Sequence, residues 1–266
     1  MTRHLFVVTD IEGAAGVSHW SQTREPGPEL ERARGFLTEE INAFVSGIQL
    51  AAANAGVDAP AITIWDGHGH GGTRFEEIDT RAAKYRYDDP RGFAGLLDLS
   101  LCATPPADAL AFVGQHAMEG SGGNLAHTYS SRRVRRHLLN GREIGEFGTR
   151  ALHAWALGLP TLFISGDDVA CEEARALVPG IVCACVKRST GVTEAVSMSR
   201  ADACALISSQ AGKILQLGLS APALEPTYRP TAPYEYRRQR RPKFGLLPLP
   251  DVTFRGDDLL ALLRRV

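Results

Sequence analysis

Five short apolar runs, each separated from the next by a stretch with helical periodicity, constrain the fold of this sequence most strongly. Each run is short and almost continuously apolar, which is typical of strands buried on both faces. The alternation predicts an α/β fold with a mainly parallel sheet flanked by helices. The runs occupy residues 5–8, 62–65, 109–113, 161–164 and 181–186.

The stretches between the runs carry helix start and stop signals. Thr38 is the expected N-cap of the first helix, which has an apolar face over residues 41–52 and ends at Gly56. Ser199 opens a capping box with Asp202, which predicts another helix start. The remaining helices are expected over residues 147–157, from Ser199 to about Gly218, and over 257–264.

A hairpin interrupts this alternation near residues 130–145. Asn140-Gly141 is the dipeptide that tolerates the positive φ angles of a tight hairpin turn, so we expect a hairpin that projects from the sheet. After about Lys187 the sequence becomes proline-rich and includes the basic run 237–241, for which a solvated strand face or a subunit contact is expected. The predicted organisation is a larger α/β domain, residues 1–187, and a smaller α+β domain, residues 188–266.

The charge balance and the apolar runs exclude several classes of partner. The chain has 29 basic and 30 acidic residues and a net charge of −1, so no general attraction to nucleic acid or to an anionic membrane is expected. The N-terminal apolar run is too short for a signal peptide, and no run approaches the ~20 residues of a membrane span. A cytoplasmic protein is expected.

The cysteines are consistent with a reducing compartment. They are odd in number and form no C-x-x-C pair, so we interpret them as reduced, mostly buried small apolar residues. They are Cys102, Cys171, Cys183, Cys185 and Cys204.

Carboxylates and imidazoles collect just after four of the predicted strands, the edge where open α/β sheets place functional groups. Each taken alone has a commoner structural role, such as a turn or a helix cap. Together they would cost several kcal/mol of repulsion and desolvation unless a cation compensated, which favours a divalent metal site. The ligand types suit zinc first, with manganese or iron possible, and a shared carboxylate can hold two ions ~3.5–4 Å apart. The residues are Asp10, Glu12, His68, His116, Asp167 and Asp168.

Two further polar residues are left undecided by this reasoning. Glu146 opens the helix after the hairpin, where an acidic residue commonly stabilises the helix N-terminus. His127 follows the glycine-rich segment 120–123, which could let a catalytic imidazole close over a substrate, although an exposed loop histidine is commoner.

The order of these short motifs resembles the D-aminopeptidase family of zinc metallopeptidases over nearly the whole chain. The motifs are Asp-x-Glu-Gly at residues 10–13, Asp-x-His at 66–68, Gly-x-His at 114–116, His127, Gly-Glu-x-Gly at 145–148 and Gly-Asp-Asp at 166–168. The resemblance implies two zinc ions bridged by Asp10, with Glu12, His68, His116 and Glu146 as the other ligands and His127 as the catalytic histidine. It also implies cleavage of the N-terminal residue of short peptides by metal-activated water, and a decameric ring.

The resemblance leaves substrate recognition open. A carboxylate must hold the substrate ammonium, and Asp167 or Asp168 is a candidate, though either could cap the following helix. Lys187 matches a family lysine and is expected to pair with site acids or to form a structural ion pair. Glycines and His70 surround His68 where the family often has serines, and Thr128, Tyr129, Ser130 and Ser131 after His127 are polar rather than apolar. These neighbours are expected to line the substrate pocket, so preference for D- or L-residues stays open.

Two other functions compete with the peptidase. A dinuclear hydrolase acting on another amide or on a phosphoester would use the same ligands, but few arginines lie near the predicted ligand loops, which disfavours the phosphoesterase. A non-catalytic, metal-stabilised binding subunit would have a closed coordination sphere.

Overall fold

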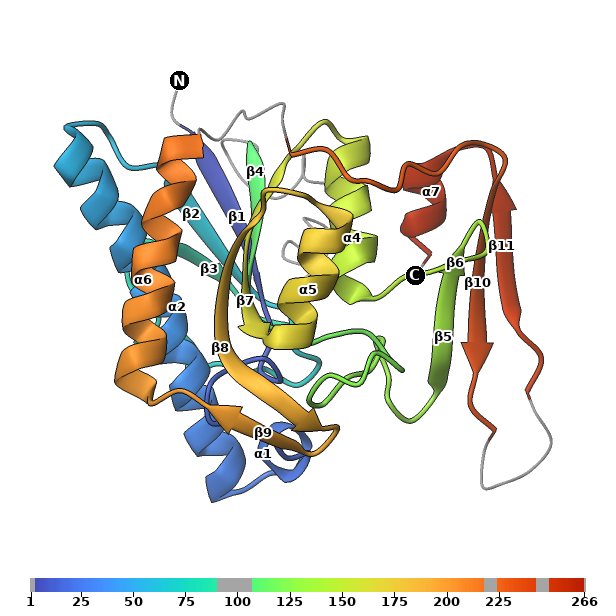
Figure 1. Cartoon of the computed structure of the whole chain (residues 1–266), viewed down its shortest axis with the longest axis horizontal. Coiled ribbons are helices and arrows are strands. Elements are labelled where there is room, and N and C mark those ends of the chain that lie inside the picture. Colours follow the sequence, from blue (N-terminus) through green and yellow to red (C-terminus); the bar gives the residue numbers. More distant parts are fainter. Residues whose placement is uncertain (1–2, 90–106, 218–223, 243–248, 266) are drawn as a thin grey trace.

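The larger sheet of the computed structural model, which describes residues 3–89, 107–217, 224–242 and 249–265, is mainly parallel (Figure 1). Its strand order is β3-β2-β1-β4-β7-β8-β9, and only the edge pair β8 and β9 is antiparallel. Each of the five apolar runs coincides with one of these strands, so the predicted α/β class is confirmed. The strands are β1 His4–Thr9, β2 Ala61–Asp66, β3 Ala83–Tyr85, β4 Ala109–Gln115, β7 Thr161–Asp167, β8 Val182–Gly191 and β9 Glu194–Ser197.

Helices cover both faces of this sheet (Figure 1). Helices α2 and α6 pack together on one face, and α4 and α5 lie on the other. Phe6, Phe112 and Phe163 are fully buried between these layers and belong to the main core. The helices are α1 Ser21–Arg24, α2 Pro28–Ala55, α4 Glu146–Ala156, α5 Asp168–Leu177, α6 Arg200–Leu217 and α7 Leu259–Leu263, with a 3-10 turn at Phe75–Glu77.

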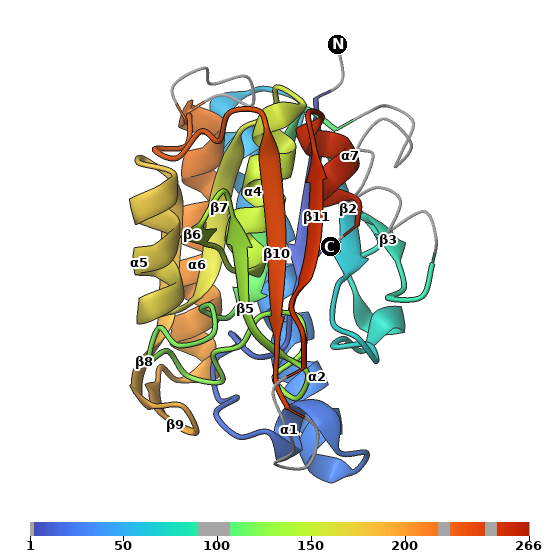
Figure 2. The same ribbon diagram turned by 90° about the vertical axis from the view of Figure 1, so that its right-hand side faces the viewer.

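A second, antiparallel sheet of order β11-β10-β5-β6 stands beyond α4 and faces the viewer in Figure 2. Asn140 and Gly141 have φ values of 46° and 80°, so the predicted hairpin is present and forms β5 and β6 of this sheet. Tyr236 and Leu139 of the sheet pack with Leu262 of α7 in a small core of their own. The strands are β5 Val134–Leu139, β6 Arg142–Glu143, β10 Tyr234–Arg240 and β11 Val252–Gly256.

The two sheets do not follow each other simply along the sequence. Strand β8 runs through residue 187, and α6 packs against α2 on the larger sheet. The smaller sheet pairs β5 with β10, which come from both sides of residue 187. A domain boundary at residue 187 stays a prediction.

The expected start of the first long helix at Thr38 is wrong. Helix α2 begins at Pro28, with Gly27 as its N-cap, and only its end at Gly56 agrees with the prediction. Pro28 at the first helical position and acidic residues in the first turn are both favourable start signals that the apolar pattern obscured. Instead, the Thr38 hydroxyl donates to the Arg34 carbonyl and accepts from the Arg74 amide.

The described cysteines, Cys171, Cys183, Cys185 and Cys204, are free thiols, as predicted, and Cys102 lies outside the described residues. Among the helices of the described ranges, none combines the length and the apolar character needed to cross a membrane.

The three strands at the centre of the sheet end level with one another. Thr9 at the end of β1 pairs with Asp66 of β2 on one side and Val113 of β4 on the other. Beyond this line, the Gly13 amide donates to the Gly114 carbonyl over 2.7 Å. The segments that follow β1, β2 and β4 therefore start at one edge of the sheet.

Glycine is required where these segments meet. A Cβ at Gly13 would lie 2.2 Å from the Gln115 carbonyl oxygen, and one at Gly114, whose φ is 77°, would lie 2.1 Å from the Asp10 carbonyl oxygen. Because both neighbours are backbone atoms, neither contact can be relieved by a side-chain rotation.

We expect Gly13→Ala to lower the free energy of unfolding by about 1–3 kcal/mol, because the added methyl overpacks rigid backbone. Gly256→Ala is the matched control, since a Cβ there meets nothing within 4 Å, and it should change stability by less than about 0.5 kcal/mol. Chemical denaturation of both variants measures the difference, and equal stabilities would contradict the close approach.

Candidate metal centre

The segments after β1, β2 and β4 bring four of the predicted ligands to one place. Asp10 and Glu12 follow β1, His68 follows β2, and His116 follows β4. Glu146 joins them from the first turn of α4, and His127 comes from the connection between β4 and β5. Sequence patterns predicted the gathering of the four strand-end residues, the family resemblance added Glu146 and His127, and the structure brings these six residues together.

Two adjacent groups of donor atoms form within this cluster. Asp10, Glu12 and His68 make one group, and His116, His127 and Glu146 make the other; within each, the ligand atoms lie within 4.8 Å of one another. The His68 Nε2 is 3.4 Å from Glu12 Oε1 in the first group. In the second group, His116 Nε2 is 3.4 Å from Glu146 Oε1, and His127 Nε2 is 3.9 Å from the same oxygen.

Asp10 connects the two groups. Its Oδ2 lies 3.3 Å from His116 Nε2, and it also offers an oxygen within 4.8 Å of the donor atoms of Glu12 and His68. A carboxylate placed between two donor groups can share its oxygens between two cations.

The imidazoles at the second group are oriented by backbone carbonyls. His116 Nδ1 lies 2.9 Å from the Ala117 oxygen, and His127 Nδ1 lies 3.0 Å from the Leu125 oxygen. Because a carbonyl only accepts, each Nδ1 carries the hydrogen, and in the neutral ring Nε2 presents a lone pair. The two rings stack with centroids 4.0 Å apart, and both Nε2 atoms approach the same oxygen, Glu146 Oε1.

The donor set fits a divalent cation. His116 Nε2 and Glu12 Oε2 are buried and have no hydrogen-bond partner within the described ranges. Burial opposes a charge on His116, but the Asp10 and Glu146 carboxylates raise its pKa well above the usual value. Without a metal, a proton on this ring therefore takes the place of a cation between the carboxylates. Carboxylate and imidazole without thiolate suit zinc, manganese or iron.

Burial and mutual charge perturb the protonation of the cluster. Burial, together with the charge of Glu12, raises the pKa of Asp10 to about 7. Burial lowers the pKa of His68, but the adjacent Glu12 carboxylate outweighs it and raises that pKa to about 9. Burial opposes ionisation of Glu146, yet its contacts with His116 and Arg150 hold its pKa well below the usual range. Protons thus occupy places where a cation would sit.

Zinc binding should release protons. At neutral pH the His68 imidazole, with a pKa of about 9, carries a proton that must leave before the nitrogen can bind metal. We therefore expect the apparent zinc affinity to rise with pH toward about 9, as measured by chelator competition. Calorimetry in buffers of different ionisation enthalpy would count the protons, and a zinc affinity independent of pH between about 6 and 8 would contradict this protonation state.

Strained backbone flanks His127. Leu125 and Tyr129 have φ values of 52° and 58°, a region that bulky residues rarely adopt. Both are held by strong contacts: the Leu125 amide donates to the Val192 carbonyl over 2.7 Å, and the Tyr129 amide donates to Glu146 Oε1 over 2.6 Å. These contacts fix the segment beside the cluster. The rings of Trp20 and His127 pack edge to face there, with their centres 5.6 Å apart.

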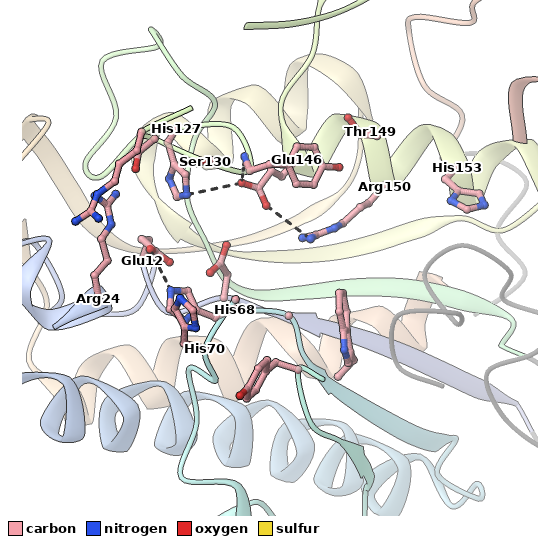
Figure 3. Close-up of a pocket in the computed structure, with 18 of the residues that line it drawn as sticks. Glu12, Arg24, His68, His70, His127, Ser130, Glu146, Thr149, Arg150 and His153 are labelled. Carbon is pink, nitrogen blue, oxygen red and sulfur yellow. Dashed lines mark hydrogen bonds and ion pairs between the residues drawn. The ribbon is translucent and has the colours of Figure 1, made fainter. Parts of the chain in front are cut away.

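A pocket of about 540 Å³ opens onto the cluster (Figure 3). Asp10, Glu12, His68, His127 and Glu146 line it, whereas the buried His116 is not among the lining residues. His70, Tyr129, Ser130 and Ser131 line it as expected from the sequence, whereas Thr128 is not among the lining residues. The lining also contains residues that sequence reasoning did not assign to the site: Arg24, Trp65, Arg132, Arg150 and His153.

The expectation that few arginines lie near the site is wrong. Arg24 comes from α1, Arg132 from the segment before β5, and Arg150 from α4, none of which is a loop at a strand end. One sequence signal existed for Arg150: it stands four residues after Glu146, and residues so spaced share a helix face.

None of the predicted substrate-binding residues Asp167, Asp168 and Lys187 lines the pocket. Asp167 is fully buried and caps α5, its Oδ1 accepting from the Ala170 amide, and Asp168 accepts from the Ser189 amide. The buried Lys187 ammonium donates to the carbonyl of Glu12 over 2.5 Å and to Asn124 Oδ1 over 2.8 Å. These contacts support the backbone around the cluster.

Comparison with known proteins agrees with this arrangement. A family model described as D-aminopeptidase (peptidase M55) matches residues 4–243. The chain belongs to this D-aminopeptidase family. Membership makes it a peptide hydrolase and favours that function over a phosphoesterase or a non-catalytic subunit.

Two known D-aminopeptidases are similar to this chain, one in sequence and one in structure. The chain is 27% identical over 235 residues to a D-aminopeptidase of Bacillus subtilis strain 168, covering 87% of this chain and 81% of that protein. It is also similar to the solved structure of a zinc-dependent D-aminopeptidase of Bacillus subtilis, described as a self-compartmentalizing protease. The TM-score is 0.80 at 23% identity, covering 98% of this chain and 94% of that one.

Proposed function

We propose that this member of the D-aminopeptidase family is a dinuclear, zinc-dependent aminopeptidase that removes the N-terminal residue of short peptides. The observation that carries the proposal is the pair of donor groups joined through Asp10 and lying beside the pocket. Asp10 would be shared between two ions, with Glu12 and His68 on one side and His116 and Glu146 on the other. Zinc is favoured by the donor types and by the zinc dependence of the structurally similar Bacillus subtilis enzyme.

The residues of the cluster supply charge and orientation. When bound, divalent ions would activate water and polarise the scissile carbonyl as Lewis acids. Glu12, Asp10 and Glu146 bring three negative charges that balance most of the charge of two such ions. The carbonyls of Ala117 and Leu125 hold the neighbouring imidazoles in place, so little reorganisation is needed when substrate enters.

His127 is the proposed catalytic residue because it lines the pocket and is largely neutral. Burial and the charge of His116 lower the pKa of His127 to about 4, so its Nε2 is a proton acceptor at neutral pH. With Nδ1 donating to Leu125, this nitrogen could receive a proton and pass it to the leaving amine. Its distance of 3.9 Å from Glu146 Oε1 also allows a ligand role, which the next experiment separates.

His127→Ala should abolish peptide hydrolysis and leave the zinc content of the protein unchanged, whereas Asp10→Ala should lose metal together with activity. Metal analysis of the purified variants and release of alanine from D-alanyl-D-alanine and L-alanyl-L-alanine make the comparison. We expect hydrolysis of the D-dipeptide, as the family name implies. Full activity in His127→Ala would contradict its catalytic role, and loss of zinc in that variant would make it a ligand.

We also propose that the chain forms a homo-oligomer, a decameric ring that encloses its active sites. The proposal rests on the family resemblance and on the self-compartmentalizing character of the structurally similar Bacillus subtilis protease. Light scattering coupled to size exclusion should give a mass about ten times the 28.7 kDa of the chain. A monomer at working concentration would contradict it.

A further inference from the structure

Arg150 is a buried cation that faces the pocket. It stands on α4, one turn after Glu146, and only 7% of its side chain is exposed to solvent. Its guanidinium carbon lies 5.6 Å from the ring centre of Trp65 and 5.8 Å from that of Tyr129. The two aromatic rings restrict the guanidinium to the wall of the pocket, where Figure 3 shows it beside Glu146.

The charge of Arg150 is only partly compensated. Its ion pair is with Glu146, at 3.6 Å from Nη2 to Oε2, and Glu146 also serves the donor cluster. Its Nε has no hydrogen-bond acceptor within the part of the chain that the structure describes, and neither has the neighbouring indole Nε1 of Trp65. Two buried donors without acceptors in one wall are costly unless a ligand supplies an acceptor.

The charges of the pocket favour an anionic ligand group. Among the described lining residues the only carboxylates are Asp10, Glu12 and Glu146, all of them in the donor groups. With those three engaged by cations, Arg24, Arg132 and Arg150 leave the pocket with an excess of positive charge. Of the three, Arg150 is the buried one, Arg24 is half-buried and Arg132 is exposed.

We propose that Arg150 binds a carboxylate of the substrate, so that this enzyme prefers peptides with a free carboxylate one residue beyond the scissile bond. This inference rests on the proposed aminopeptidase function. A guanidinium presents paired N–H donors in a plane that matches a carboxylate, which a lysine cannot reproduce. In a dipeptide the terminal carboxylate lies one residue beyond the bond that is cut. An acidic side chain in the second position offers the same group.

The geometry also separates the two ends of such a substrate. In Figure 3, Arg24 and Arg150 lie on opposite sides of the group formed by Glu12, His68 and Glu146. The Arg24 guanidinium is stacked on Trp20, 3.4 Å from the ring centre, close to the His127 side of the pocket. The carboxyl end of a peptide held over the cluster can therefore reach one of the two guanidinium groups, and the burial of Arg150 and its Nε without an acceptor favour Arg150.

The first test compares substrates on the unmodified, zinc-loaded enzyme. Alanyl-alanine should be hydrolysed with a kcat/KM at least about tenfold above that of its C-terminal amide, the magnitude expected for one charge-assisted contact. The amide of alanyl-glutamate, which carries only a side-chain carboxylate, distinguishes the two sources of the anion. Equal rates for all three substrates would overturn the inference and leave the aminopeptidase intact.

The second test assigns the contact to Arg150. Arg150→Gln should remove the preference for the acid, mainly through a higher KM for the dipeptide, so that the acid and the amide are hydrolysed with similar kcat/KM. Arg150→Lys should restore part of it, and Arg175→Gln, an exposed arginine on α5, is the matched control that should change nothing. Loss of the preference in Arg24→Gln rather than in Arg150→Gln would overturn the assignment.

A binding measurement separates this inference from the proposed function. N-acetylalanine, whose carboxylate is free, should bind to the zinc-loaded protein at least about tenfold more tightly than N-acetylalaninamide, as measured by calorimetry. Arg150→Gln, checked for unchanged zinc content, should abolish the difference. If no peptide is hydrolysed but the acid still binds through Arg150, the aminopeptidase proposal fails and the anion site stands; if neither ligand is preferred, the site is absent.

Discussion

Repulsion among three buried carboxylates is the constraint on which the rest of this structure depends. Asp10, Glu12 and Glu146 are each less than a tenth exposed and lie around one small volume. In a medium of low polarity such a cluster is stable only when protons, cations or positively charged side chains offset it. The raised pKa values of Asp10 and His68 are the response of the metal-free protein, which retains protons where a metal ion fits.

The fold holds the three carboxylates close together mainly through backbone contacts. Level strand ends at β1, β2 and β4 fix where the connecting segments begin, and the contact of Gly13 with Gly114 holds two of them together. Lys187, buried among carbonyls of the first segment, adds a positive charge behind Glu12. The strand pairing and the Gly13–Gly114 contact join backbone atoms, so they do not depend on the protonation state of the donor side chains.

Much of this arrangement could be predicted from sequence, since it depends on local patterns. Apolar runs mark the strands, and parallel strands bring their carboxyl ends to one edge, so Asp10, His68 and His116 had to be neighbours. Glu146 and His127 were recoverable only by resemblance, because an acidic helix start and a loop histidine have commoner structural roles. The early start of α2 was missed because polar residues 28–37 hide its apolar face. Asp167 and Lys187 were assigned to substrate because a strand end does not reveal whether a side chain points into the pocket or beneath it.

The wall of the pocket was the least predictable part, and the reason is physical. Arg24, Arg132 and Arg150 come from three elements whose meeting depends on how the smaller sheet and α1 pack beside the larger sheet. The hydrophobic periodicity of a single segment does not predict how separate elements pack against one another. Yet the wall of the pocket determines the substrate, because the same metal-binding donors would serve amides or phosphoesters. A wall with a buried guanidinium, and with no carboxylate outside the donor groups among the described lining residues, selects for a negatively charged substrate group.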